Sequence, residues 1–300
     1  MNRKTAVVGA VASAACFGSL AVLTTLAYER GAQPLQLLTW RFGLAAVLLG
    51  GYLVLRKPES LRVGPGDIGR FAVLSFAGYG AASICFFFAL TFAPAAVVGI
   101  LLYTYPAIVT LAEWAFLGLR PGSPRLLAVL VAFTGCALVA DPFGSHGTVA
   151  WPGVFLGIGA AVAYASFSVL SHRWLPGRTR SGLMAYMFLF TTVLAGGAAC
   201  ATGTSLSVSG WSADVWLLLA AIVAFPTFIA IVLYLAALRT LGPSQAAIVS
   251  TFEPLFTIAL AAVLLGERLT PVQWIGAGLV LAGVVAAEMV ARRVEEMPAV

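Results

Sequence analysis

Ten long runs of apolar residues, separated by short polar connections, dominate this sequence of 300 residues. An α-helix rises 1.5 Å per residue, so about 20 residues match a hydrocarbon layer about 30 Å thick. Backbone groups in lipid must be bonded within their own segment, which favours helices at these run lengths. The runs predict an all-α integral membrane protein with ten transmembrane helices, at residues 5–28, 35–55, 69–91, 95–118, 124–141, 152–175, 182–202, 213–238, 243–265 and 271–291.

The composition excludes a water-soluble globular domain. Hydrophobic residues make up 61% of the chain and charged residues only 9%, whereas a soluble domain has about 25% charged residues. The four cysteines lie inside apolar runs without the spacing of metal ligands, so we expect free thiols. The net charge is +6, but the basic residues form no cluster interleaved with exposed aromatic residues, so we expect no nucleic-acid partner.

The distribution of lysine and arginine predicts how the chain is oriented. Fourteen of the 17 basic residues fall on one side of the predicted helices, while Arg30 and Arg268 fall on the other and Arg41 lies within a span. Because basic residues concentrate in cytoplasmic loops, both termini are expected in the cytoplasm. The first run resembles a signal peptide, but its removal would leave nine spans and spoil the alternation of charge, so we expect it to be retained.

An internal repeat is visible at an offset of 148 residues, without gaps. It pairs Gly9 with Gly157, Pro106 with Pro254, Arg120 with Arg268, and Gly135 with Gly283. Matches between alanines or leucines are expected by chance in so apolar a chain, so the prolines, glycines and arginines carry the inference. Chance is the alternative explanation. The repeat predicts a five-helix unit at residues 1–148 and a second at residues 149–300.

The two units are expected to have opposite orientations. Five spans is an odd number, so the second unit crosses the membrane in the opposite sense to the first. Arg120 and Arg268 occupy equivalent positions and fall on opposite sides in the distribution of charge. Inverted repeats are typical of secondary transporters, in which one site near the midplane opens to either side in turn.

A motif in the second unit resembles a known family. Leu264-Leu265-Gly266-Glu267-Arg268-Leu269-Thr270 leads to Gln273-Trp274-Ile275-Gly276-Ala277 and Leu281-Ala282-Gly283, and Glu253-Pro254 precedes it. This pattern is similar to the second repeat of the EamA-type transporters of the drug/metabolite transporter superfamily, and the resemblance covers the whole chain. It implies a multi-pass protein of the bacterial inner membrane that exports amino acids or related metabolites, as in the branch of aromatic and neutral amino-acid exporters. Leu119 departs from the family's acidic residue, matched here by Glu267, which argues against a substrate-binding role for Glu267.

Two prolines mark the predicted transport site. Pro106 and Pro254 lie in the middle of the fourth and ninth predicted spans, where proline removes a backbone hydrogen bond. Repeat-related helix breaks near the midplane point to a transport site. Each break is either a hinge or a packing kink without ligand contact. Gly78, Gly80 and Pro226 are the other predicted hinges.

Three charged residues lie within predicted spans. Glu253 directly precedes Pro254 and either stays protonated, pairs with a cation, receives a substrate ammonium group, or makes a structural hydrogen bond. Arg41 either extends to the membrane surface, makes a structural bond, or belongs to a gating or packing pair. Glu113 is equally ambiguous, because the sequence chooses no partner for it.

Aromatic and small polar residues surround the predicted breaks. Their rings suit the apolar part of a solute and their hydroxyls suit its polar end, although such residues also fill helix surfaces that face lipid. The candidate substrate-binding residues are Tyr79, Tyr103, Tyr105, Tyr164, Ser166, Thr227, Phe228, Thr251 and Glu253.

These features predict a secondary transporter that exports small amphipathic metabolites by alternating access, with apolar or aromatic amino acids favoured. The alternative within transport is a multidrug or organic-cation exporter. An intramembrane lipid-processing enzyme would need a nucleophile with a base, or clustered metal ligands, and the sequence shows neither, so we expect no catalytic residue, metal or cofactor. The expected partners are the small-molecule substrate and the lipid bilayer, in a monomer or a homodimer.

Overall fold

The computed structural model describes residues 2–117, 122–140, 149–174 and 180–295, which form helices and turns and include no strand. The first half contains α1 (Arg3–Glu29), α2 (Pro34–Arg56), η1 (Pro58–Leu61), α3 (Pro65–Val73), η2 (Leu74–Tyr79), α4 (Gly80–Ala89), α5 (Ala95–Leu102), α6 (Tyr105–Leu117) and α7 (Ser123–Ala140). The second half contains α8 (Trp151–Trp174), α9 (Arg180–Thr202), α10 (Ala213–Ile222), η3 (Val223–Ile229), α11 (Ala230–Ser250), α12 (Glu253–Leu264) and α13 (Pro271–Glu295). The fold class is therefore all-helical.

Seven of these helical segments are long and apolar enough to cross a membrane: Arg3–Glu29, Pro34–Arg56, Pro65–Ala89, Ala95–Ala112, Trp151–Ser171, Ser181–Thr202 and Ala213–Ala237. Three shorter apolar helices cover Leu126–Val139, Glu253–Leu264 and Pro271–Ala286. Each of these ten segments overlaps one of the ten predicted runs, and seven of the segments are long enough to span a membrane.

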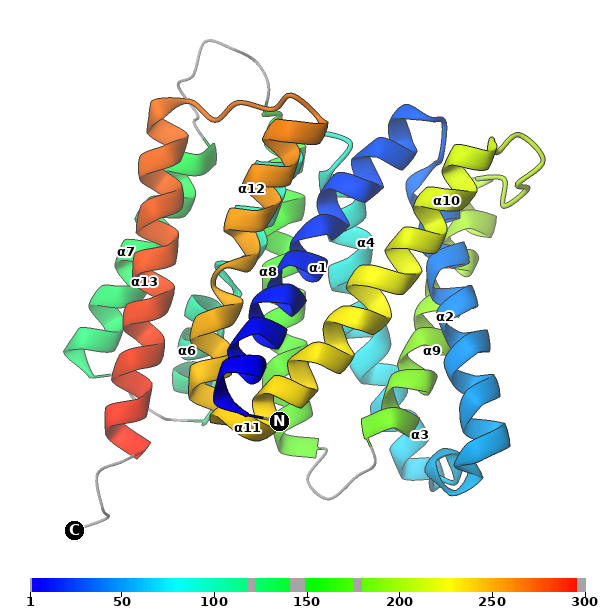
Figure 1. The fold of residues 1–300 in the computed structure, drawn as a ribbon, viewed down its shortest axis with the longest axis horizontal. Coiled ribbons are helices and arrows are strands. Elements are labelled where there is room, and N and C mark those ends of the chain that lie inside the picture. The colour runs from blue at the N-terminus through cyan, green and yellow to red at the C-terminus, as the bar shows by residue number, and fades with distance from the viewer. Residues whose placement is uncertain (1, 118–121, 141–148, 175–179, 296–300) are drawn as a thin grey trace.

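The helices form a bundle (Figure 1). The α7 and α13 helices pack together at one edge and α2 packs on α9 at the opposite edge, with α1, α8 and α12 between them (Figure 1). The first turn of α1 and the last turn of α13 lie at the same end of the bundle (Figure 1).

Glycines bring α7 and α13 into backbone contact. A Cβ atom at Gly135 would lie 2.6 Å from the carbonyl oxygen of Gly276, and one at Gly276 would lie 2.7 Å from that of Gly135. A Cβ at Gly283 would meet the carbonyl oxygen of Ala128 at 2.7 Å. Small residues permit this close approach, so these glycines pack helices within the chain.

One predicted boundary is wrong. The sequence predicts a connection between residues 238 and 243, but α11 is helical from Ala230 to Ser250 without a break. Hydropathy places the connection at the polar stretch around Arg239, and a helix tolerates such residues where they are outside lipid. The interruption occurs instead at Thr251 and Phe252.

Candidate functional site

Two helix interruptions shape the centre of the bundle. The first separates α5 from α6 at Tyr103 and Thr104, and the second separates α11 from α12 at Thr251 and Phe252. Both prolines that the sequence singled out lie just beyond a break, at the second residue of the following helix. Proline is tolerated there because the first helical N–H groups have no partner within the helix.

The prolines therefore act differently from the expected mid-span bend. Pro106 and Pro254 begin new helices, and the chain breaks two to three residues before each of them. Thr104 stabilises the first break, because its hydroxyl donates to the carbonyl oxygen of Leu101 at 2.7 Å. Each break is thus a short non-helical turn, and its N–H groups at Tyr103, Thr104 and Phe252 donate to carbonyl groups of the preceding helix.

Tyr103 bridges the two breaks. Its hydroxyl donates to the carbonyl oxygen of Ser250 and lies 3.2 Å from Glu253 Oε2. The two halves of the chain approach closely here, because a Cβ at Gly99 of α5 would lie 3.0 Å from Thr257 Cγ2 of α12. The structure thus brings together Tyr103 and Glu253, two of the predicted site residues.

Glu253 is the first residue of α12 and is partly buried. A carboxylate at this position interacts favourably with the positive end of the helix dipole. The α1 helix closes one side of it, because a Cβ at Gly18 would lie only 2.7 Å from the Glu253 carbonyl oxygen. The Thr257 hydroxyl fixes this contact by donating to the carbonyl of Gly18 at 3.0 Å.

A continuous row of aromatic rings leads away from this carboxylate. Each ring lies 4.8 to 6.1 Å from the next, measured between ring centroids, which is the range of favourable aromatic pairs. We call it the aromatic row: Tyr103, Tyr105, Tyr164, Phe167, Tyr79 and Phe42. Four of the nine predicted substrate-binding residues belong to it.

Arg41 lies at the far end of the aromatic row, next to Phe42. Its side chain is 3% exposed, so it does not extend to the surface of the bundle. Its Nε–H donates to Thr227 Oγ1 at 3.2 Å, and its guanidinium carbon lies 4.7 Å from the centroid of Phe42 and 5.5 Å from that of Phe87. Arg41 is a buried cation held by a hydroxyl and two rings.

Two π-helical segments position these groups. Tyr79 ends η2, and Thr227 lies in η3, where its hydroxyl donates to the Ile222 carbonyl at 2.9 Å. Short π-helical segments are frequent at functional sites. Pro226 lies inside η3, and its missing N–H is one local reason for the widened turn.

Gly78 and Gly80, predicted as hinges, lie at close contacts. A Cβ at Gly78 would lie 2.9 Å from the Cβ of Phe167, and one at Gly80 would lie 2.4 Å from the carbonyl oxygen of Ser75. A side chain at Gly78 would displace η2 from Phe167, so Gly78 lets η2 bring Tyr79 against that ring. A side chain at Gly80 would instead meet the backbone of η2 itself.

The other candidates are less closely associated with the aromatic row. The Ser166 hydroxyl donates to the Val162 carbonyl of its own helix at 2.9 Å. The ring of Phe228 contacts that of Phe188, with centroids 6.2 Å apart. Thr251 lies in the turn before α12, and the side chain of Glu113 lies outside the described residues.

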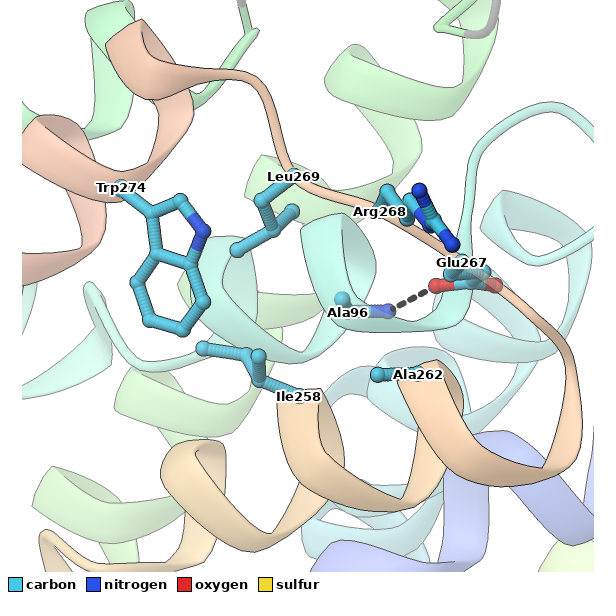
Figure 2. A pocket seen from close by; sticks show the side chains of 7 residues that line it. All are labelled: Ala96, Ile258, Ala262, Glu267, Arg268, Leu269 and Trp274. Carbon is cyan, nitrogen blue, oxygen red and sulfur yellow. Dashed lines mark hydrogen bonds between the residues drawn. The ribbon is translucent and has the colours of Figure 1, made fainter.

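Glu267 has a role that the sequence analysis missed. Its carboxylate accepts the N–H of Ala95 at 2.7 Å, at the start of α5. It also accepts the N–H of Ala96 at 3.0 Å (Figure 2). Gly266, with φ of +68°, ends the turn after α12, and the Glu267 N–H donates to the Ala261 carbonyl, which fixes the position of the carboxylate. The sequence held one signal for this role: Pro94 precedes α5 and has no side chain that can cap a helix, so the first N–H groups of α5 need an acceptor from elsewhere in the chain.

A cavity of ≈ 260 Å³ lies beside this contact (Figure 2). Ile258, Leu269 and Trp274 form its apolar part, and Glu267 and Arg268 lie at its other side (Figure 2). None of the predicted substrate-binding residues lines it.

Comparison with known proteins places the chain among transporters. A family model described as the EamA-like transporter family matches residues 4–140 and 151–288. The chain is 30% identical over 290 residues to the uncharacterized transporter YcbK of Bacillus subtilis (strain 168), covering 88% of this chain and 86% of that protein. It is 25% identical to the uncharacterized inner membrane transporter YicL of Salmonella typhimurium, over 94% of each chain. A solved crystal structure at 21% identity shares the fold with a TM-score of 0.65, over 98% of this chain and 100% of the other.

Proposed function

Because this chain belongs to the EamA-like transporter family, we propose that it exports small amphipathic metabolites, above all amino acids with apolar or aromatic side chains, by alternating access. The observation that carries this proposal is the contact between Tyr103 and Glu253 at the two helix breaks, next to a row of aromatic rings. A carboxylate suits the ammonium group of an amino acid, and the rings suit its apolar side chain.

Paired features at matching positions support a repeat of two five-helix units, residues 1–148 and 149–300. The break at Tyr103 and Thr104 corresponds, 148 residues later, to the break at Thr251 and Phe252. The π-helical segments η2 and η3 are related by nearly the same offset, and the family model matches the chain twice. These pairs support an arrangement of ten transmembrane helices with opposite orientations of the two halves.

The proposed orientation places both termini in the cytoplasm of a bacterium, with the chain in its inner membrane. The ends of α1 and α13 at one end of the bundle fit an even number of crossings (Figure 1). In this orientation Arg30 and Glu267 lie on the outer side, and the two breaks lie between the two surfaces. The proposed transport site consists of Glu253 and the aromatic row, with Thr227, Phe228, Ser166 and Thr251 as further candidates around it.

The export of organic cations or drugs is the second candidate function. The same carboxylate beside aromatic rings would attract a lipophilic cation. The two candidate substrate classes share a positive charge and an apolar body, but an amino acid also carries a carboxylate group and a lipophilic cation does not. Transport assays with both classes separate them.

Counterflow in proteoliposomes tests the proposal. The purified protein is reconstituted into liposomes preloaded with either unlabelled L-phenylalanine or unlabelled tetraphenylphosphonium, and uptake of the labelled form of the same solute is measured. Glu253→Gln removes one charge-assisted hydrogen bond to an ammonium group, which is worth about 10- to 100-fold in affinity. We therefore expect amino-acid counterflow to fall at least about tenfold in this variant.

Glu59→Gln is the matched control, because Glu59 is exposed on η1, and it should transport normally. Both variants must elute as a single species and melt within a few degrees of the wild type. Exchange of tetraphenylphosphonium without any exchange of neutral amino acids would refute the amino-acid proposal and favour the cation exporter.

A further inference from the structure

The guanidinium group of Arg41 has donors without acceptors. Arginine carries five N–H donors, and among the described residues only the Nε–H of Arg41 has a hydrogen-bond acceptor, Thr227 Oγ1. In the described part of the chain, the fully enclosed polar side-chain atoms that lack a partner belong to Thr24, Thr25, Ser171 and Thr191. The two terminal nitrogens of Arg41 are not among them, so the described protein atoms do not fully enclose these nitrogens.

Arg41 also has no anionic partner among the described side chains. The two ion pairs described are Arg30 with Asp214 and Arg70 with Asp67, and both are near the surface of the bundle. The rings of Phe42 and Phe87 attract the cation by their faces. That attraction is weaker than a carboxylate contact, and a buried charge without a counter-ion is costly.

The surroundings of Arg41 point into the proposed transport site. The two rings that contact Arg41 are each next to a tyrosine, because the centroid of Phe42 lies 5.7 Å from that of Tyr79 and the centroid of Phe87 lies 6.5 Å from that of Tyr28. The Tyr28 hydroxyl already donates to the Phe87 carbonyl at 3.1 Å, while Tyr79 belongs to the aromatic row. The row thus has a carboxylate, Glu253, at one end and an unneutralised guanidinium at the other.

From this geometry we propose that Arg41 binds the carboxylate, or another anionic group, of the transported solute. A guanidinium presents two parallel N–H groups that match a carboxylate. The inference rests on the proposed function, because it takes the aromatic row as the transport site. Arg41 and Glu253 lie at opposite ends of that row, so the adjacent ammonium and carboxylate groups of one amino acid contact them one at a time, and Arg41 is a second binding position along the row. The inference narrows the substrate class to amphipathic solutes that carry an anionic group, and it separates them from simple organic cations.

Binding to four related probes tests this inference: L-phenylalanine, 3-phenylpropionate, L-phenylalanine methyl ester and phenethylamine. The first two carry a carboxylate and the last two do not. Apparent affinities are measured by thermal stabilisation of the purified full-length protein, for the wild type, Arg41→Gln, Arg41→Lys and the control Arg30→Gln. Arg30 lies in the same half of the chain as Arg41, is exposed, and pairs with Asp214 at 3.7 Å.

We expect Arg41→Gln to weaken binding of the two carboxylates at least about tenfold and to leave the ester and the amine within about twofold. Arg41→Lys keeps the charge but loses the planar pair of donors, so it should weaken the carboxylates less, again without affecting the ester. If Arg41→Gln does not fold, Arg41→Lys carries the test. Arg30→Gln should bind all four probes as the wild type does.

Two results would overturn the inference in distinguishable ways. If the wild type binds L-phenylalanine and the Arg41 variants weaken the acid and its ester equally, Arg41 is not the carboxylate site, while the proposed function stands. If the wild type binds phenethylamine but neither carboxylate, both the inference and the amino-acid proposal are wrong. Absence of binding to all four probes likewise refutes both.

Discussion

The contact between Glu267 and the start of α5 offers a sharp test of the structure, because it joins residues 171 and 172 positions apart. The first N–H groups of a helix have no partner within it, and Pro94 supplies no side-chain cap. Glu267 accepts two of these N–H groups through both carboxylate oxygens. Glu267→Ala should therefore release the start of α5 from the turn that follows α12.

The expected magnitude follows from the two bonds. A hydrogen bond to a charged group contributes about 1.5–3 kcal/mol, and Glu267 is only partly buried, so the lower value is appropriate for each bond. Glu267→Ala should then destabilise the contact by about 3 kcal/mol, which is a factor of about 100 in the local opening equilibrium. Glu267→Gln keeps one acceptor oxygen without the charge and should cost about 1–2 kcal/mol.

Hydrogen exchange followed by mass spectrometry measures this opening directly. Peptides that contain Ala95 and Ala96 should lose protection by about 100-fold in Glu267→Ala, and by less in Glu267→Gln. Asp214→Asn is the control, since the pair between Asp214 and Arg30 is exposed and 3.7 Å long, and such pairs contribute little. Unchanged exchange at Ala95 and Ala96 in both Glu267 variants would refute the capping role.

Two glycine substitutions should be damaging because a Cβ would meet backbone. Gly18→Ala places a methyl group 2.7 Å from the Glu253 carbonyl oxygen, so we expect a loss of about 1–3 kcal/mol of stability and lower counterflow, measured by thermal unfolding and in proteoliposomes. Gly135→Ala would place a Cβ 2.6 Å from the Gly276 carbonyl oxygen, so it should separate α7 from α13 and reduce stability by a similar free energy, seen as a lower unfolding midpoint. Gly50→Ala is the control for both, because nothing lies within 4 Å of its Cβ. A midpoint equal to that of Gly50→Ala in either variant would show that the helices are not packed as described.

The positions of the helices were largely predictable from the sequence. The predicted run 35–55 matches α2 (Pro34–Arg56), and the run 152–175 matches α8 (Trp151–Trp174), because hydropathy records where apolar side chains must be. It does not record how the backbone is wound within a run. The π-helical turn of η2 lies inside the predicted span 69–91, and only Gly78 and Gly80 marked it in the sequence.

The site could be predicted in part. Repeat-related prolines drew attention to Glu253 and Tyr103, which the structure brings to 3.2 Å. Phe42 and Phe167 complete the aromatic row, yet neither was among the predicted site residues, because aromatic residues are common throughout such a chain. Their roles depend on which helices are neighbours, and that information is tertiary.

Glu267 shows how a departure from the repeat can carry a structural meaning. Its carboxylate joins the start of α5 in the first half to the turn after α12 in the second, but the equivalent position in the first half is Leu119, which has no acceptor. Under the proposed alternating access, two identical inverted halves would make the closed arrangements at the two ends of the bundle equally stable. Because Leu119 supplies no carboxylate at the position equivalent to Glu267, we expect the closed arrangement of the end that contains Glu267 to be favoured over the closed arrangement of the other. Weakening the cap in Glu267→Gln should then shift the balance between the two states as well as loosen α5.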